Sequence, residues 1–203
     1  MFKKYILGSA LLTLALAAGA ANAALVVDTG TPDNSVGQLA LDNNDWLAGQ
    51  ITFNQALQIN SIKGFLDDMG LGGGNFNVAL YNDNGSNHIG SLVYSGQATY
   101  GTVGWNGLSG MNLSVNAGKY WVGFEVDDGT SNFVAAQYAP NALARTAYTD
   151  GSNQNSYHHL NGLSFGVQVD ATAVAAVPEP ETYAMMLAGL GLLGFMSRRR
   201  KSA

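Results

Sequence analysis

The chain has 203 residues, a net charge of −5 and no cysteine, which excludes disulfides, thiol catalysis and cysteine-ligated zinc. Six of its nine basic residues lie near the two ends, so the central part carries three basic and twelve acidic residues. This negative charge argues against nucleic acid and anionic lipid surfaces as partners of that part.

The first 23 residues have the features of a signal peptide. Two lysines precede an apolar stretch, Ile6–Ala18, and Ala21 and Ala23 form a small-residue cleavage motif. We expect a signal helix over residues 1–23 that signal peptidase removes by cutting between Ala23 and Ala24. The protein is therefore predicted to be exported.

Residues 24–170 are predicted to form one all-β domain. Apolar residues recur there with a period of two, and Gly, Asn and Asp interrupt them about every ten positions. In the stretch KYWVGFEV, Tyr120, Val122 and Phe124 are expected to share one strand face. This pattern is typical of an antiparallel β-sandwich, jelly-roll-like in architecture. The expected strands cover residues 50–53, 57–66, 76–81, 88–95, 111–115, 119–127, 132–138 and 163–170.

Candidate catalytic and metal-binding residues in this domain have simpler interpretations. Ser164 lies in GLSFG, the letters of a nucleophile elbow, but the residues after it have the pattern of a strand rather than a helix. Clusters such as Asp67-Asp68 and Asn82-Asp83-Asn84 are typical of turns. We expect no catalytic residue and no cofactor, with a structural calcium ion at converging acidic loops as the open alternative.

Aromatic and histidine residues offer a second kind of site. His158 and His159 are adjacent, point to opposite faces if they lie in a strand, and are expected to be solvated loop residues. Trp121 lies inside an apolar strand and is expected in the core. Trp105, in GTVGWNG, is the candidate for an exposed ring that stacks on a sugar.

The C-terminal part differs from the body in composition. Residues 171–181 form an Ala- and Pro-containing linker, and residues 182–203 are predicted to form a short transmembrane helix with a basic end. The uncharged run Tyr183–Met196 would be about 21 Å long as a helix, which is short for a hydrocarbon core of about 30 Å. The basic stop, expected on the cytoplasmic side, consists of Arg198, Arg199, Arg200 and Lys201.

This tail resembles the PEP-CTERM sorting signal of Gram-negative bacteria. The resemblance rests on Val177, Pro178, Glu179 and Pro180, followed by a short apolar helix and a terminal arginine cluster. It implies that an inner-membrane exosortase recognises the Pro-Glu-Pro motif, removes the helix and basic tail, and passes the body to the cell surface or the extracellular matrix. It also implies association with exopolysaccharide and biofilm. The body resembles, more loosely, β-sandwich domains found with interchangeable surface anchors.

The sequence thus predicts a non-enzymatic exported protein that is held transiently at the inner membrane and then works at the cell surface or in the extracellular matrix. Signal peptidase and exosortase are the expected processing enzymes, exopolysaccharide is the possible binding partner, and nucleic acid is excluded. A carbohydrate-binding module and a secreted hydrolase that uses paired carboxylates are the alternatives.

Overall fold

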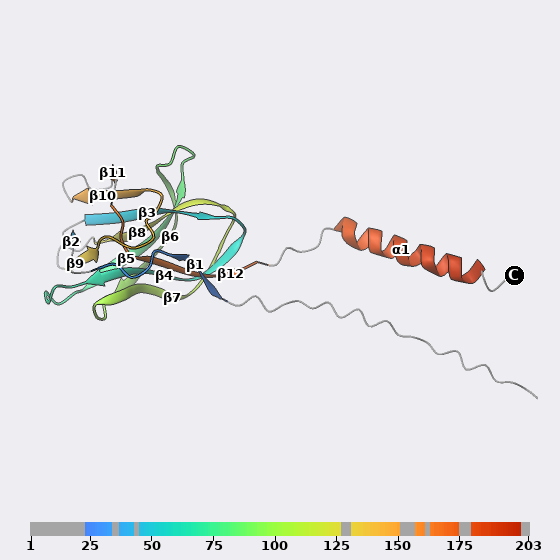
Figure 1. The fold of residues 1–203 in the computed structure, drawn as a ribbon, viewed down its shortest axis with the longest axis horizontal. Coiled ribbons are helices and arrows are strands. Elements are labelled where there is room, and N and C mark those ends of the chain that lie inside the picture. Colours follow the sequence, from blue (N-terminus) through green and yellow to red (C-terminus); the bar gives the residue numbers. More distant parts are fainter. Residues whose placement is uncertain are drawn as a thin grey trace, which may run out of the picture.

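The computed structural model describes residues 23–33, 37–42, 45–126, 131–150, 157–160, 163–174 and 180–199. Within these ranges the chain forms twelve strands and one helix (Figure 1). The strands make two antiparallel sheets of six strands each. The all-β prediction is therefore confirmed, whereas the predicted signal helix falls outside the described residues.

The first sheet is built around the long strand β4 (Leu57–Asp67). Strand β7 (Gly104–Val115) pairs with one edge of β4. The other edge pairs first with β12 (Val167–Ala173) and then, at Leu66 and Asp67, with β9 (Asn132–Ala136). The sheet is completed by β1 (Ala24–Asp28) beside β12 and β2 (Gln38–Asp42) beside β9.

The second sheet positions the candidate site. Its order is β11-β10-β3-β8-β5-β6, so strands from the two ends of the domain lie side by side. Every pairing in it is antiparallel. The strands are β3 (Asp45–Phe53), β5 (Asn75–Asp83), β6 (Ile89–Thr99), β8 (Gly118–Glu125), β10 (Thr146–Asp150) and β11 (His158–Leu160).

The two sheets pack face to face over one apolar core. Phe124 of β8 is 1% exposed, and its ring meets Phe165, which lies just before β12 of the first sheet, at 6.1 Å between centroids. A Cβ on Gly64 of β4 would lie 2.9 Å from the Phe124 ring, so a glycine lets the sheets approach at this point. The arrangement is that of a β-sandwich, as predicted, while a jelly-roll connection stays a prediction.

The period of two correctly identified the core face of β8. Tyr120, Val122 and Phe124 are all buried in the core. Trp121 is also fully buried, as expected, but on the opposite face of the strand. Strands β1, β2, β10 and β11 were not predicted, because each has only three to five residues, which is too short for a period of two to stand out.

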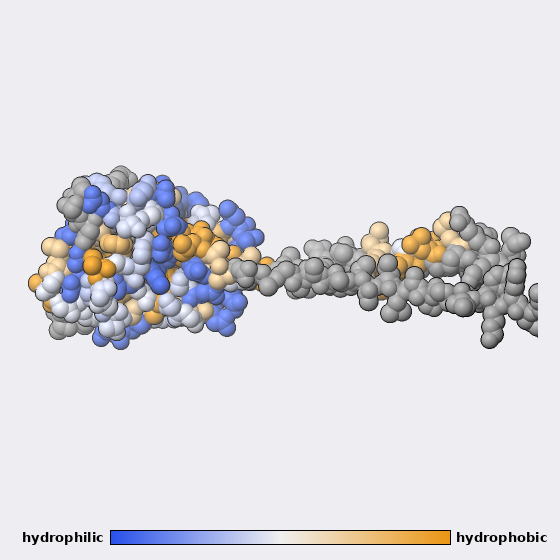
Figure 2. All heavy atoms as spheres, turned by 60° about the horizontal axis from the view of Figure 1, so that its bottom comes forward, coloured by the Kyte–Doolittle hydropathy of each residue, from blue (hydrophilic) through white to orange (hydrophobic). Residues whose placement is uncertain are grey.

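Helix α1 (Pro180–Arg199) begins two residues before the predicted start of the helical segment. A proline suits the first turn, where its missing N–H costs no hydrogen bond. The apolar side chains described in α1 are exposed, and Figure 2 shows them along the helix. The predicted transmembrane helix is not confirmed, since no helix in the described ranges is both long and apolar enough to cross a membrane. The twenty residues of α1 include three charged residues and three glycines.

Candidate functional site

The outer face of the second sheet contains a row of very small side chains. Ala147 of β10 pairs with Ala48 of β3, Ala48 pairs with Gly123 of β8, and Gly123 pairs with Ala79 of β5. Because paired residues share a face, these four positions form a shallow channel across four strands. All three alanines are fully buried, so other side chains cover the channel.

Larger side chains flank this small-residue row on both sides. One flank holds Trp46 opposite Glu125, and the other holds Gln50 opposite Trp121, with Tyr81 opposite Trp121 in the next strand. Tyr157, which precedes β11, lies over the row: a Cβ on Gly123 would be 3.0 Å from the Tyr157 hydroxyl. The glycine therefore leaves the room that this tyrosine occupies.

A buried carboxylate holds two of the aromatic rings in place. Glu125 is 5% exposed, and its Oε1 accepts hydrogen bonds from the hydroxyls of Tyr81 at 2.6 Å and Tyr157 at 2.8 Å. The Tyr157 ring also contacts Trp46 at 5.6 Å and Tyr81 at 6.2 Å between centroids. Charge-assisted hydrogen bonds of this kind fix ring positions firmly.

A second carboxylate binds two side chains of the other flank, Gln50 and Trp121. Asp83 Oδ2 accepts hydrogen bonds from Gln50 Nε2 at 2.7 Å and Trp121 Nε1 at 3.0 Å. Burial alone would raise the pKa of Asp83, but these two bonds and those from the amides of Gly85 and Asn87 outweigh it and lower the pKa below 3.8. Asp83 therefore stays ionised as an acceptor for the buried indole.

His159 joins this cluster from β11. Its ring lies 4.2 Å from that of His88 and 5.3 Å from that of Trp121, between centroids. Its Nδ1 is buried and has no hydrogen-bond partner among the described residues. Burial, and then the nearby charges of His88 and Arg145, lower its pKa below 6.5, against the opposing effect of Asp83. The expectation of solvated loop histidines was wrong for His159, because β11 pairs with β10 and turns this side chain onto the sheet.

These residues surround a pocket of about 450 Å³ on the outer face of the sheet. Its volume lies within the range of small-molecule sites. Its rings come from both ends of the domain, and the side chain of His88 is exposed at its edge. We name it the outer-face pocket; its lining residues are Trp46, Tyr81, His88, Ile89, Gly90, Tyr157 and His159.

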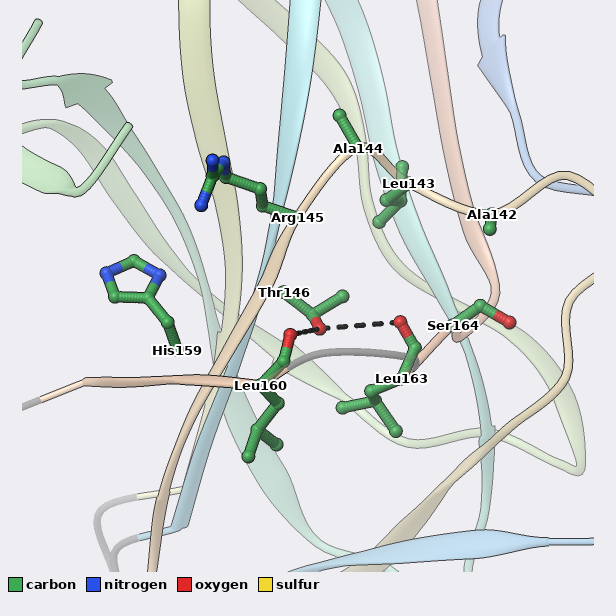
Figure 3. A pocket seen from close by; sticks show the side chains of 9 residues that line it. All are labelled: Ala142, Leu143, Ala144, Arg145, Thr146, His159, Leu160, Leu163 and Ser164. Carbon is green, nitrogen blue, oxygen red and sulfur yellow. Dashed lines mark hydrogen bonds between the residues drawn. The ribbon is translucent and has the colours of Figure 1, made fainter. Parts of the chain in front are cut away.

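A second pocket, of about 440 Å³, shares His159 and contains the serine of the GLSFG motif (Figure 3). Ser164 donates to the carbonyl of Ala139 at 3.3 Å, and Figure 3 places its hydroxyl at the far end of the pocket from His159. Thr146 lies between them and donates to the carbonyls of Leu160 and Leu163. Strand β12 follows at Val167, so the strand-turn-helix context of a nucleophile elbow is not formed.

The structure places Trp105 away from the outer-face pocket. It lies on β7 of the first sheet, is half-buried, and meets Phe65 of β4 edge-on at 5.5 Å between centroids. Sequence reasoning selected it because glycines surround it, and missed Trp46. The available signal for Trp46 was the outward-facing positions of β3, β5 and β8, which combine an aromatic residue, a small residue and a polar or acidic residue, whereas a solvent-facing strand would be uniformly polar there.

The acidic clusters form turns where they are described. Asp68 accepts from the amides of Gly70 and Gly72, and Asp83 accepts from those of Gly85 and Asn87. The turn interpretation of these clusters is confirmed. Among the described residues, no three His, Asp or Glu side chains are grouped as a metal ion would require. A further acidic pair in the sequence, Asp127-Asp128, lies outside the described ranges.

Most of the predicted processing residues lie outside the described part of the chain. These are Ala21, Val177, Pro178, Glu179, Arg200 and Lys201. Pro180 begins α1, and Arg198 and Arg199 end it. Ala24 is the first residue of β1, so the predicted cut after Ala23 falls immediately before this edge strand begins.

Comparison with known proteins decides the nature of this tail. A family profile described as the PEP-CTERM protein-sorting motif matches residues 176–201. The chain carries a PEP-CTERM sorting motif. This motif marks an exported protein that is sorted by exosortase to the cell surface, so the resemblance stated from the sequence is confirmed. No curated protein matches the chain.

Proposed function

We propose that this PEP-CTERM protein is a non-enzymatic component of the cell surface or the extracellular matrix, associated with exopolysaccharide. The observation that carries the proposal is the sorting motif at residues 176–201, which follows directly on an acidic two-sheet body. Signal peptidase removes residues 1–23, and exosortase then recognises Pro178, Glu179 and Pro180 and cuts near them. The released body is the functional product.

A structural role, as opposed to an enzymatic one, is supported by how the polar residues of the body are used. The Ser164 hydroxyl is bonded to a backbone carbonyl. The carboxylates of Glu125 and Asp83 each accept hydrogen bonds from two side chains that hold the outer face of the second sheet together. A glycoside hydrolase would need two carboxyl groups free to exchange protons with substrate.

Glycan binding is the second candidate function of the body. It is favoured by the gathering of aromatic rings around the outer-face pocket. Aromatic side chains with polar tips suit ligands that have one apolar face and one hydroxylated edge.

The location part of the proposal is tested by fractionating cells that express this protein with and without exosortase. In the parent strain we expect the protein outside the inner membrane, and in the deletion strain we expect it retained in the cell envelope. A Glu179→Gln variant in the parent strain should behave like wild type in the deletion strain. The same distribution in both strains would overturn the proposal.

A further inference from the structure

We propose that the outer-face pocket binds a neutral sugar ring, and that Trp46 and Tyr157, and not Trp105, supply the stacking surface. This inference rests on the second candidate function and names its site. It is independent of the sorting of the protein, because the pocket lies wholly within the body.

The shape of the sheet face favours a binding site. The row Ala147, Ala48, Gly123 and Ala79 lowers the floor of the second sheet between two flanks of large side chains. Tyr157 stands in this row, against Trp46 on one side and Tyr81 on the other. The small residues let Tyr157 lie close to the sheet, and the recess that remains is bounded by the rings around it and is already shaped before a ligand arrives.

Rings in and beneath the pocket are held rigidly. Tyr81 and Tyr157 are both anchored through their hydroxyls to Oε1 of the buried Glu125. Trp121, beneath His159, is anchored to Asp83. The two tyrosine walls of the pocket, and the tryptophan that packs against its His159 wall, therefore lose little conformational freedom on binding, which lowers the cost of association.

The charge of the pocket lining favours a neutral ligand. The acidic side chains of the cluster, Glu125 and Asp83, do not line the pocket, and each accepts hydrogen bonds from two side chains of the cluster. The lining consists of aromatic, histidine, isoleucine and glycine residues. Burial and neighbouring positive charge lower the pKa of His159, so at neutral pH its imidazole offers one donor and one acceptor and no charge. Such a lining favours a neutral ligand over a cation or an anion.

The exposure of the pocket favours a sugar over a purely apolar molecule. The pocket opens to solvent beside the exposed His88, and its four other rings are half-buried. An apolar ligand gains most in an enclosed site, whereas a sugar keeps its hydroxyls in water and lays its C–H face on a ring. The open geometry also lets a polymer continue beyond the ring that is bound.

The test is affinity electrophoresis of the intact protein through native gels that contain a neutral glucan, galactan, mannan or xylan, with alginate as the acidic polymer. We expect at least one neutral gel to slow the wild type. Trp46→Ala should weaken that retardation about tenfold or more, the loss of one ring contact. The matched variant, Trp105→Ala on the opposite sheet, should leave it unchanged.

Two further variants keep the test decisive if circular dichroism shows that the Trp46→Ala variant is unfolded. Tyr157→Ala removes the second stacking ring. Gly123→Ala places a Cβ 3.0 Å from the Tyr157 hydroxyl and 3.1 Å from Glu125 Oε1, so it displaces the ring without deleting it. Both should weaken retardation while the fold is kept.

Three results would overturn the inference. They are retardation by none of the neutral gels, retardation by alginate alone, and retardation that Trp105→Ala removes and Trp46→Ala preserves. Each leaves the sorting proposal standing, because that proposal is judged by the location of the protein.

Discussion

Trp121 Nε1 and Asp83 Oδ2 lie 3.0 Å apart and form a hydrogen bond between β8 and β5 on the outer face of the second sheet. Trp121 is fully buried there, in a small cluster separate from the main core. A sandwich domain usually exposes its outer faces to water, so a buried indole with a paired carboxylate shows that this face has a core of its own.

Replacing this indole should therefore destabilise the domain. Trp121→Phe removes the donor to Asp83 and leaves a cavity, and we expect the free energy of unfolding to fall by about 1–3 kcal/mol. Urea denaturation followed by circular dichroism measures it. Trp105→Phe is the control, and its loss should be smaller because Trp105 is only half-buried. Equal losses of unfolding free energy in the two variants would contradict the conclusion that the outer face of the second sheet has a core of its own.

The stability of the domain should depend on pH through His159. Burial and the charges of His88 and Arg145 lower its pKa in the folded state, while Asp83 opposes them. Below the unfolded pKa of about 6.5, the unfolded chain binds more protons than the folded one. The free energy of unfolding should thus be highest above about pH 6.5, should fall as the pH drops below 6.5 toward the lower folded-state pKa, and should level off once both states are protonated.

Urea midpoints at several pH values between about 7.5 and 5 measure this dependence. His159→Gln should flatten the curve over this range. His158→Gln should leave it as in wild type, because the side chain of His158 is exposed. A midpoint that rises as the pH falls, or an unchanged slope in His159→Gln, would show that burial of His159 is unimportant.

The close approach of the two sheets predicts that alanine substitutions at two glycines, Gly64 and Gly118, have different effects on the stability of the domain. In Gly64→Ala the new Cβ would lie 2.9 Å from the Phe124 ring, so the ring must move inside a filled core. We expect a loss of about 1–3 kcal/mol. Gly118→Ala meets only Tyr120, at 3.5 Å, and should be close to neutral. Thermal melts of both variants measure the contrast, and equal melting temperatures would contradict this packing.

The sequence allowed the core of the sandwich to be predicted because its strands follow local rules. Tyr120, Val122 and Phe124 alternate with residues of the other face, and this period can be read within one segment. The sorting motif could also be recognised from the sequence, because its Pro-Glu-Pro motif, apolar helix and basic cluster follow one another directly in the chain. Both kinds of signal are contained in a short stretch of chain.

The outer-face pocket could not be predicted in the same way, because strand order brings it together. Trp46 and Tyr157 are more than one hundred residues apart, and they meet because β11 and β10 add to the edge of β3. These added strands are short, so their pairing was not visible. Without that pairing, His88 and His159 had no reason to be placed side by side.

The intact mass of the mature protein, purified from cells that contain exosortase, tests the central claim most directly. The account predicts a product that begins at Ala24 and lacks the tail after the Pro-Glu-Pro motif, including Tyr183 to Ala203. A mature protein that still carries this tail in such cells would contradict the account.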